Sequence, residues 1–358
     1  MTDLRTGSAT EWLRGEGPSN DVVVSSRVRL ARNFAGFPFP AKCDPAQRRE
    51  VLDYAQRQIL GSNLAKEMLW IDLCELSSLE REVLMERHLI SKQLAKSEGP
   101  RALAVSSPDE RLAIMINEED HLRVQAIRRG LDLDDAFRHV NEVDDSLEAN
   151  ADFAYSSRFG YLTACPTNVG TGIRMSVMLH LPGLKLAGDL EKVRRAARAM
   201  SLAVRGFYGE GSEAVGDFYQ ISNQTTLGKS ERDLLHDFEH NVIPKVIDYE
   251  RLARKTLLDK RKSILEDQVH RAYGTLLHAR LLKTDEAMQL LSLVRLGLML
   301  ELLPGISLDQ IGRLVLLIQP AHLQRMLGRE LDQAERRLER ATIVRRVLSD
   351  ERGVKSII

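Results

Sequence analysis

Residues 101–116 read RALAVSSPDERLAIMI, and this stretch decides which class of fold the sequence favours. Two apolar runs, residues 101–106 and 111–116, are separated by residues 107–110, SPDE, which are typical of a turn. Two runs joined by so short a connection predict an antiparallel hairpin, because parallel neighbours need a long crossover. The hairpin argues against a wholly parallel, doubly wound sheet.

The chain mixes short strand-like runs with helical patterns up to Asn223, and after Ser230 it is almost purely helical. Alternation and β-branched content predict strands at residues 22–30, 101–106, 111–116, 121–127, 172–181 and 218–222. Apolar periodicity predicts helices at residues 45–68, 79–96, 133–149, 190–204 and 231–258. Asp44 with Pro45 marks the start of the first helix, and Ser77 followed by Glu80 predicts a capping box for the second.

These elements predict an α+β fold, in which an antiparallel sheet flanked by helices is followed by an all-helical C-terminal domain. A length of 358 residues is enough for two domains. We expect residues 1–250 to form the sheet-containing domain and residues 251–358 the helical one. We see no internal repeat and no low-complexity segment.

Composition excludes several classes of protein. Lys and Arg total 51 and Asp and Glu total 51, so the formal net charge is zero. Any basic patch must therefore be local, and a dedicated nucleic-acid binder is not expected. Three cysteines without a CxxC pair suggest neither a disulfide framework nor a zinc site. The N-terminus lacks the pattern of a secretory signal, and the apolar stretch 290–303 is too short to span a membrane. We therefore expect a cytoplasmic protein.

Three predicted strands each present arginine on their polar face. The period of two along residues 21–30 places Arg27 and Arg29 together with Ser25, opposite Val24, Ser26, Val28 and Leu30. The same rule places Arg123 with His121 and Gln125, opposite Leu122, Val124 and Ala126. It also places Arg174 with Ser176 and His180, opposite Ile173, Met175, Val177 and Leu179.

If these strands share one sheet, the four arginines converge and repel one another unless an anion lies among them. A nucleotide triphosphate would fit such a cluster. Each arginine taken alone is better explained by exposure to solvent or by a nearby carboxylate, and it is their recurrence beside the unusual loops that favours an anion site. The glycine-containing loop CPTNVGTG, residues 165–172, is neither a Walker phosphate loop nor a dinucleotide fingerprint.

Four segments, in this order, resemble the guanidino kinases, which comprise the creatine and arginine kinases and their bacterial relatives. They are VVVSSRVRLARNFAGFPFP at 22–40, NEEDHLR at 117–123, CPTNVGTGIRMSVMLHLP at 165–182 and RGFYGEG at 205–211. The sequence most resembles the bacterial protein arginine kinases. Only about twenty residues precede the first motif, where phosphagen kinases have a helical domain, and residues 265–298 are similar to the helical extension of the bacterial enzymes.

The resemblance implies a role for individual residues of the guanidino-kinase-like domain. Glu119 and Glu210 match the carboxylates that grip the acceptor guanidinium, and Cys165 matches a cysteine beside it. The implied ATP-binding residues are Ser25, Ser26, Arg27, Val28, Arg29, His88, Arg123, Arg174, Met175, Ser176, Val177, Met178, Arg205, Gly206, Phe207, Tyr208, Gly209 and Glu210. ATP and Mg²⁺ are the implied cofactors, and the sequence leaves the metal ligands unknown.

The activity implied is ATP-dependent phosphorylation of arginine side chains in proteins, in a setting of stress response and protein quality control. A kinase for free arginine and a catalytically idle adaptor are the alternatives. The implied partners are protein substrates, an activator protein, a heat-shock repressor and a Clp protease. Direct binding to nucleic acid or to a membrane is not expected. Homodimer formation stays open.

Two patterns near helices leave alternatives open. RRLERA at 336–341 resembles the allosteric phosphoarginine motif Arg-Asp-x-x-Arg-Ala of the protein arginine kinases, with Arg337 in place of aspartate. Arg336 and Arg340 then lie on one face, although a basic solvated helix explains them almost as well. His236 and His240 have a spacing that permits a metal site, but the sequence shows no third ligand, so we interpret them as surface residues.

Overall fold

The computed structural model describes residues 10–207 and 215–349 and contains one large antiparallel sheet. Its strands are β1 (Val23–Arg32), β2 (Met68–Asp72), β3 (Ala102–Ser106), β4 (Leu112–Ile116), β5 (Leu122–Arg129), β8 (Ile173–His180), β9 (Leu202–Arg205) and β10 (Phe218–Asn223). They follow the order β2-β3-β4-β5-β1-β8-β10-β9, and β6 (Tyr155–Ser156) and β7 (Gly160–Tyr161) form a separate small hairpin. The hairpin predicted for residues 101–116 is confirmed as β3 and β4.

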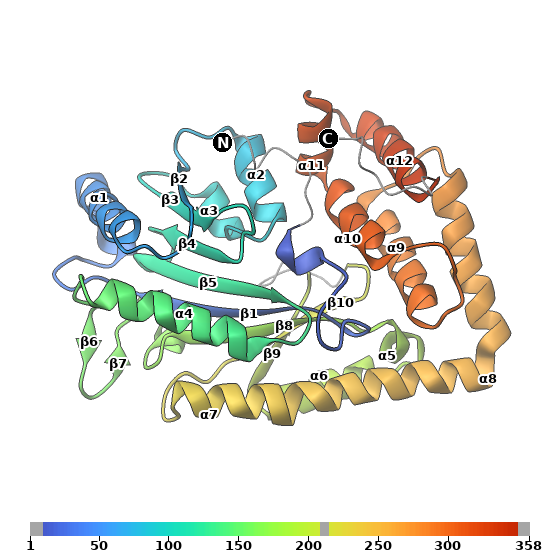
Figure 1. Ribbon diagram of the computed structural model, residues 1–358, viewed down its shortest axis with the longest axis horizontal. Coiled ribbons are helices and arrows are strands. Elements are labelled where there is room, and N and C mark those ends of the chain that lie inside the picture. The colour runs from blue at the N-terminus through green and yellow to red at the C-terminus, as the bar shows by residue number, and fades with distance from the viewer. Residues whose placement is uncertain (1–9, 208–214, 350–358) are drawn as a thin grey trace.

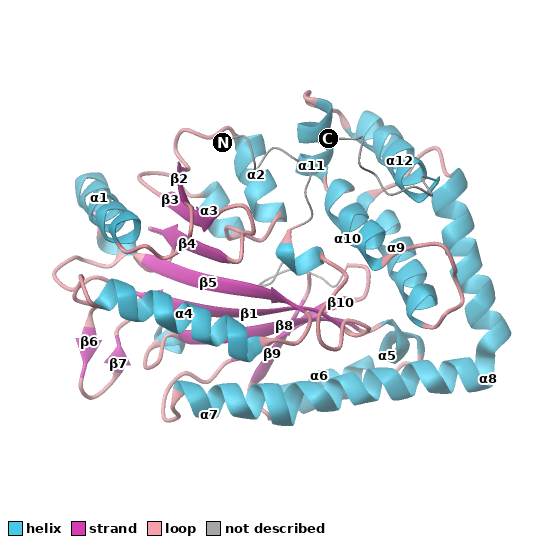
Figure 2. Ribbon diagram, viewed as in Figure 1, coloured by secondary structure: helices cyan, strands magenta, loops and turns pink. Residues whose placement is uncertain are grey.

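The helices of the sheet-containing region are α1 (Pro45–Gly61), α2 (Ser78–Glu86), α3 (Lys92–Lys96), α4 (Leu133–Glu148), α5 (Pro182–Leu186), α6 (Leu190–Ala199) and α7 (Glu231–His236). A π-helical segment, Asp237–Val242, joins α7 to the long α8 (Ile243–His278). The remaining helices are α9 (Thr284–Met299), α10 (Leu308–Leu317), α11 (Pro320–Leu327) and α12 (Gln333–Ser349). The predicted α+β class is confirmed (Figure 1, Figure 2).

One face of the sheet holds the main hydrophobic core. Helices α1, α4, α6 and α7 and the start of α8 cover this face, and their apolar side chains pack on alternate residues of the strands. Leu30, Val124 and Ile173 are examples from β1, β5 and β8, all almost completely buried. Burial of this size is the main stabilising contribution to the fold.

On the opposite face, the described residues form apolar clusters at the two ends of the sheet. At one end, Leu84 of α2 and Leu94 of α3 pack on Leu103 of β3. At the other end, Met178 of β8 and Phe218 of β10 join the core of the C-terminal helices. The strand positions between these two clusters carry polar side chains, and a cavity opens there.

The predicted alternation is correct for β5 and wrong at one residue of β1. Leu122, Val124 and Ala126 all enter the main core as predicted. Val24 was predicted on the same face as Val28, but it packs against the opposite core. The register of β1 against β8 shifts between Val23 and Ser25, and such an irregularity moves one side chain to the other face.

Three predicted helices extend too far. The first ends at Gly61, and its predicted last residue, Met68, instead begins β2, because β3 offers a pairing partner. The second is interrupted after Glu86, where His88 has a positive φ of 61° that no α-helix accommodates. The fourth predicted helix, at residues 190–204, ends at Ala199, and the residues that follow form β9, which pairs with β10. Local propensity cannot show a strand that exists only because a neighbour completes it.

Both predicted helix starts are confirmed. Asp44 caps α1 and exchanges bonds with Gln47, and Pro45 occupies the first turn. Ser77 and Glu80 form the expected capping box of α2. Each satisfies backbone N–H groups that have no partner within their own helix.

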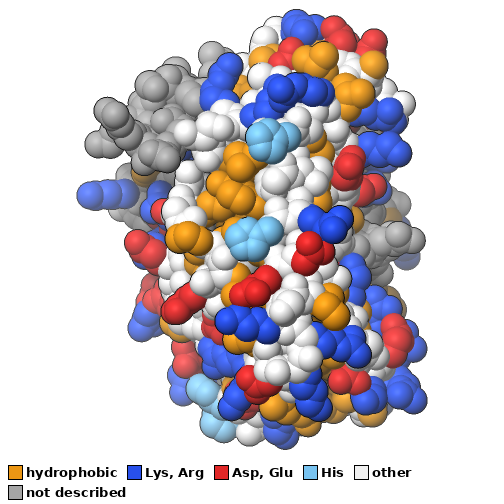
Figure 3. Space-filling view, turned by 90° about the vertical axis from the view of Figure 1, so that its right-hand side faces the viewer, with side chains coloured by type: hydrophobic (Ala, Val, Ile, Leu, Met, Phe, Trp, Pro, Cys, Tyr) orange, Lys and Arg blue, Asp and Glu red, His pale blue; other side chains and the backbone are white. Residues whose placement is uncertain are grey.

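The long helix α8 leads from the sheet into the C-terminal helices and has non-helical backbone angles at Arg261. The predicted boundary between residues 250 and 251 falls inside this helix and stays a prediction. Arg254, beyond that boundary, still donates to the backbone oxygen of His180 in β8, at 3.0 Å. On the face that these helices present in Figure 3, basic and acidic side chains are interspersed around a strip of apolar ones. Among residues 10–207 and 215–349, no helix has the length and apolar character needed to cross a membrane.

Candidate active site

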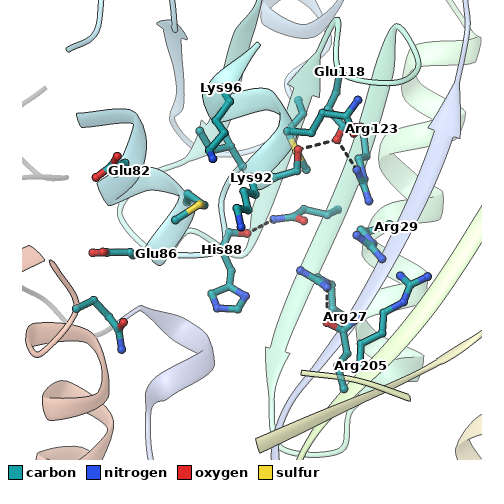
Figure 4. A pocket seen from close by; sticks show the side chains of 18 of the residues that line it. Arg27, Arg29, Glu82, Glu86, His88, Lys92, Lys96, Glu118, Arg123 and Arg205 are labelled. Carbon is teal, nitrogen blue, oxygen red and sulfur yellow. Dashed lines mark hydrogen bonds and ion pairs between the residues drawn. The ribbon is translucent and has the colours of Figure 1, made fainter. Parts of the chain in front are cut away.

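A cavity of about 1140 Å³ lies on the polar face of the sheet, between α2, α3 and the C-terminal helices. The sheet supplies one wall, the segment around His88 a second, and the starts of α9 and α12 a third. Figure 4 shows Arg27, Arg29, Arg123 and Arg205 on the sheet side of the cavity, with His88 across from them. The cavity therefore brings together side chains from both ends of the chain.

Five arginines from four strands line this cavity. They are Arg27 and Arg29 of β1, Arg123 of β5, Arg174 of β8 and Arg205 of β9. Arg29 and Arg174 are direct partners in the β1–β8 register. The Nη2 atom of Arg27 donates to Oε1 of Gln220 at 3.1 Å, which directs the guanidinium across β8 toward β10.

The cluster is electrostatically unfavourable in the absence of an anion. Burial, followed by the charges on Arg123, Arg174 and Arg205, lowers the pKa of Arg27 to about 9. Burial and three neighbouring guanidinium groups also hold the pKa of Arg29 well below its ordinary value. The Nε atom of Arg29 is buried and finds no hydrogen-bond acceptor within the described residues. A polyanion would supply both the missing charge and the missing acceptor.

His88 closes the side of the cavity that faces the arginines. Its ring lies 4.6 Å from that of Trp12 and 5.3 Å from that of Phe207, and its backbone oxygen accepts from Nε2 of Gln125 at 2.8 Å. Burial, with a smaller effect of Arg27, lowers the pKa of His88 to about 3. The imidazole is therefore neutral at physiological pH, and an aromatic group of this kind can pack on a flat ligand.

The loop between β4 and β5 brings three carboxylates to the cavity. Asn117 has a positive φ of 58°, which makes the turn tight enough for Glu118, Glu119 and Asp120 to follow one another along the cavity wall. Glu118 is held by Arg123, with 2.8 Å between Oε1 and Nη1, and by the hydroxyl of Ser91. It balances part of the arginine charge.

Glu119 is the carboxylate of this loop with the clearest access to the cavity. It is half-buried, and burial, then the charges of Glu118 and Asp120, raise its pKa above the ordinary value. A raised pKa makes a carboxylate a better proton acceptor than an ordinary one. The predicted role of Glu119 stays a prediction, and the structure supplies a suitable environment for it.

The loop at 165–172 borders the cavity through its far half. Asn168 and Gly172 are among the lining residues, whereas Cys165 is not. The Sγ atom of Cys165 lies 3.0 Å from Oγ1 of Thr167. A side chain at Gly172 would collide with the backbone oxygen of Ala31, and its φ of 68° also favours glycine. The loop is thus fixed against β1 at the residue that enters β8.

Several residues assigned to ATP on resemblance have side chains directed away from the cavity. Ser26 donates to the backbone oxygen of Gly130 at 2.7 Å, and Val28, Met175 and Val177 lie in the main core. Ser25, Ser176, Met178, Gly206 and Phe207 are described but do not line the cavity. Contacts of ATP with Ser26, Val28, Met175 and Val177 would have to use the backbone. The hydroxyl of Ser176 accepts from Nε of Arg27 at 3.4 Å, on the arginine face. All these ATP contacts stay predictions. Tyr208, Gly209 and Glu210 lie outside the described residues.

The third wall of the cavity comes from the C-terminal helices. Arg336, Arg337 and Arg340 of α12 line it together with Asp285 of α9. Arg340 is buried, and its guanidinium donates to the backbone oxygens of Ile318 at 2.7 Å and Leu282 at 2.9 Å. Burial and the charge of Arg336 lower the pKa of Arg340 to about 10.

Glu86, at the end of α2, fastens this third wall to the sheet-containing region. Its carboxylate accepts from the backbone nitrogens of Ala321 at 2.8 Å and His322 at 2.9 Å, and lies 2.6 Å from Nδ1 of His322. These backbone groups begin α11, so Glu86 caps a helix that is more than two hundred residues away in sequence. Since His88 follows Glu86 by two residues, the same contact supports the position of His88.

We expect Glu86→Ala to lower the free energy of unfolding by about 3 kcal/mol, because it leaves buried N–H donors without an acceptor. Urea denaturation followed by circular dichroism measures this. Glu82→Ala, one turn earlier on α2 and exposed, is the matched control and should change stability by less than about 0.5 kcal/mol. Equal stability of the two variants would show that Glu86 does not hold the wall.

Sequence reasoning missed several residues of the site. Glu118 was not given a role, although it shares its motif with Glu119. Lys92 and Lys96 of α3 line the cavity, and their spacing of four on a helix was an available signal. Gln220 and Asp285 gave no local signal, because only the tertiary fold brings β10 and α9 to this cavity.

His236 is the last residue of α7, and His240 lies on the π-helical segment that follows. Ligand atoms of Asp134, Glu239 and His240 lie within 4.8 Å of one another, but His236 is not part of this group, so the two predicted histidines do not form a metal site together. Asp134 belongs to α4, and the sequence does not show that α4 packs there. Glu239 already accepts the backbone N–H of Leu133 at 3.0 Å, so it caps α4, and we assign no metal to this group.

Comparison with known families matches both parts of the chain. Residues 53–253 match the family described as ATP:guanido phosphotransferase, C-terminal catalytic domain. Residues 262–356 match the family described as Protein-arginine kinase McsB C-terminal domain. Among solved structures, a duplicated taurocyamine kinase from Schistosoma mansoni is 26% identical, with a TM-score of 0.58, and the similarity covers 66% of this chain and 34% of that one. A lombricine kinase is 28% identical, with a TM-score of 0.55 and 70% of each chain covered.

Curated relatives are similar over nearly the whole chain. The protein-arginine kinase of Pelotomaculum thermopropionicum is 45% identical over 94% of this chain and 95% of its own length. The protein-arginine kinase of Symbiobacterium thermophilum is 44% identical over 97% of this chain and 99% of its own. Taken with the arginine cluster and the carboxylate loop, these matches show that the chain belongs to the ATP:guanido phosphotransferase family, among the protein-arginine kinases.

Proposed function

We propose that this protein transfers the γ-phosphoryl group of ATP to arginine side chains of other proteins. The observation that carries the proposal is the convergence of five strand arginines and a carboxylate loop on one cavity. The arginines match a triphosphate, and the carboxylates match a guanidinium. Membership of the protein-arginine kinases supports both the donor and the acceptor.

The arginines would act on the donor. Phosphoryl transfer passes through a loose, charge-spread transition state, so catalysis depends on alignment and on cations around the transferred group. Arg29 and Arg174, paired across β1 and β8, and Arg27 beside them would hold phosphate oxygens through forked contacts. Because the sheet fixes these positions before ATP binds, little reorganisation would be needed.

The carboxylates would act on the acceptor. An arginine guanidinium has a pKa above about 12, so its nitrogen must lose a proton as it attacks phosphorus. In the step proposed, a P–N bond forms, the P–O bond to ADP breaks, and the proton passes to a carboxylate. Glu119 is well placed for this by its raised pKa, and Glu210 is its proposed partner.

Mg²⁺ fits the same cavity. It prefers oxygen ligands and usually binds to nucleotide phosphates with one or two carboxylates. Glu118, Glu119 and Asp120 make the β4–β5 loop the oxygen-rich part of the cavity, next to the arginines. When bound there, Mg²⁺ would neutralise charge on the transferred phosphoryl group. We propose that this loop, together with the triphosphate, holds it.

Phosphorylation of free arginine is the second candidate, since the same groups would serve a free amino acid. A mixed assay separates the two: free arginine and an unfolded protein are offered together with ATP and Mg²⁺, and each acceptor is analysed by mass spectrometry at neutral pH. We expect phosphoarginine in the protein. Labelling of free arginine alone would overturn the preference, and no labelled arginine in either would favour the idle adaptor.

The implied partners beyond protein substrates, namely an activator protein, a heat-shock repressor, a Clp protease and a second copy of the chain, are part of the same proposal. They rest on family membership, and so do the proposed cytoplasmic location and the proposed role in stress response.

For the proposed phosphoarginine site on α12, we expect either weak binding of free phosphoarginine or the recruitment of another acidic residue to the site. Arg337 puts a cation where the family motif has a carboxylate, and Arg340 already donates to backbone oxygens. Replacing that repulsion with an ion pair in Arg337→Asp should tighten binding by about tenfold or more. Titration calorimetry on both proteins measures this. Tight wild-type binding that aspartate does not improve would contradict the assignment.

A further inference from the structure

One buried carboxylate links the two loops that carry the proposed acceptor-side groups. Asp120 directly follows Glu119 and is only 2% exposed. Its Oδ1 atom accepts the backbone N–H of Ala164, the residue before Cys165, at 2.7 Å. This bond therefore joins the residue next to Glu119 to the residue next to Cys165.

Asn33 also holds this carboxylate. Its Nδ2 atom donates to the same Oδ1 of Asp120 at 2.6 Å and to the backbone oxygen of Leu162 at 3.1 Å. Its Oδ1 atom accepts the backbone N–H of His121 at 2.9 Å. One amide side chain, 1% exposed, thus uses its donors and its acceptor to contact both loops.

The surroundings make these contacts rigid. Asn33 directly follows β1, and its backbone oxygen accepts from the nitrogen of Ala154 at 2.7 Å. The Nδ1 atom of His121 accepts from the backbone of Phe34 at 3.0 Å, so Nε2 is the protonated nitrogen and donates to Pro38 at 2.8 Å. The β6–β7 hairpin lies at the same end of the sheet, where β5 begins (Figure 1).

We infer that Asn33 and Asp120 form a bracket that sets the position of Glu119 relative to Cys165 and so positions the acceptor guanidinium. The inference deepens the proposed function and rests on it for the identity of the acceptor. Oδ1 of Asp120 already accepts two bonds, which suits a positioning residue rather than a proton acceptor. Displacement of a reacting group by about 1 Å can reduce the rate by about 10²-fold.

Thiol alkylation tests the bracket without any substrate. The rate at which iodoacetamide modifies Cys165 is compared with the rate at exposed Cys74 in the same protein, by peptide mass spectrometry. We expect Asn33→Ala and Asp120→Ala to change this ratio by about threefold or more, because the loop is released. Asn150→Ala, an exposed position after α4, is the matched control and should leave the ratio unchanged.

Kinetics with the protein acceptor test the positioning role. Asn33→Ala and Asp120→Ala should lower kcat/KM for the acceptor by about 10- to 100-fold. Affinity for a non-hydrolysable ATP analogue, measured without Mg²⁺, should stay within about twofold, since the strand arginines are unaffected. Asp120→Asn should recover most of the loss seen in Asp120→Ala, because an amide oxygen can accept the same two bonds.

The outcomes separate the bracket from other roles. An unchanged alkylation ratio in both alanine variants would overturn the inference, and so would a changed ratio with unchanged acceptor kinetics. Equal losses in Asp120→Asn and Asp120→Ala would mean that the charge acts directly, which also overturns it. If wild type labelled no arginine, the proposed function would fail, while the alkylation ratio would still report on the bracket. If Asp120→Ala does not fold, Asn33→Ala removes the contact from the other side.

Discussion

Replacing Glu119 with glutamine is expected to lower kcat by about 10² to 10⁴ while ATP affinity stays nearly unchanged. The amide keeps the size of the side chain but cannot take a proton from the acceptor guanidinium. Rapid-quench measurement of ADP formation with a saturating protein acceptor gives kcat, and titration calorimetry gives the affinity for ATP. The separation of the two quantities is the informative result.

A matched control is available in the same region. Glu82→Gln removes another carboxylate that lines the cavity, but from α2, and should leave kcat close to wild type. Burial, and then the charges of Glu118 and Asp120, raise the pKa of Glu119. As the solution is acidified, Glu119 therefore takes up its proton at a higher pH than an ordinary glutamate does. We expect wild-type activity to be lost at that higher pH. Full turnover in Glu119→Gln would remove this residue from the mechanism.

Replacing Arg29 with methionine is expected to have opposite effects on binding and on stability. ATP affinity should fall by about 10- to 150-fold, because a charge-assisted contact worth roughly 1.5 to 3 kcal/mol is lost. The melting temperature of the unliganded protein should rise. Folding lowers the pKa of Arg29, so at any pH below the ordinary pKa of arginine this side chain destabilises the folded state. Methionine removes that destabilising effect and fills most of the same space.

Differential scanning calorimetry with and without ATP measures both effects in one series. Arg198→Met, at the exposed end of α6, is the control and should change neither quantity. A lower melting temperature for unliganded Arg29→Met would show that this arginine stabilises the fold. Equal ATP affinity would contradict the role of the strand arginines in phosphate binding.

The arginine cluster could be predicted because its determinants are local. A period of two places Arg27 and Arg29 on one face of a strand, and that rule holds wherever the strand is regular. The hairpin of β3 and β4 could likewise be predicted from the turn residues 107–110 between its strands. The prediction was wrong at Val24, since a register shift depends on the neighbouring strand.

The walls of the cavity opposite the sheet could not be predicted in the same way. Glu86 looks like an ordinary residue of a polar helix, and its contact with the start of α11 exists only after the chain has folded. The bracket of Asn33 and Asp120 joins residues that are 87 positions apart. His88 was assigned by resemblance, and the positive φ that ends α2 there was not expected.

The central claim is that the phosphoryl group reaches a guanidinium nitrogen of a protein. It is tested most directly by peptide mass spectrometry at neutral pH on an unfolded protein incubated with this enzyme, ATP and Mg²⁺. We predict phosphorylation on arginine, lost after brief treatment with acid and absent with Glu119→Gln. Phosphorylation confined to serine, threonine or tyrosine and stable in acid would contradict the claim.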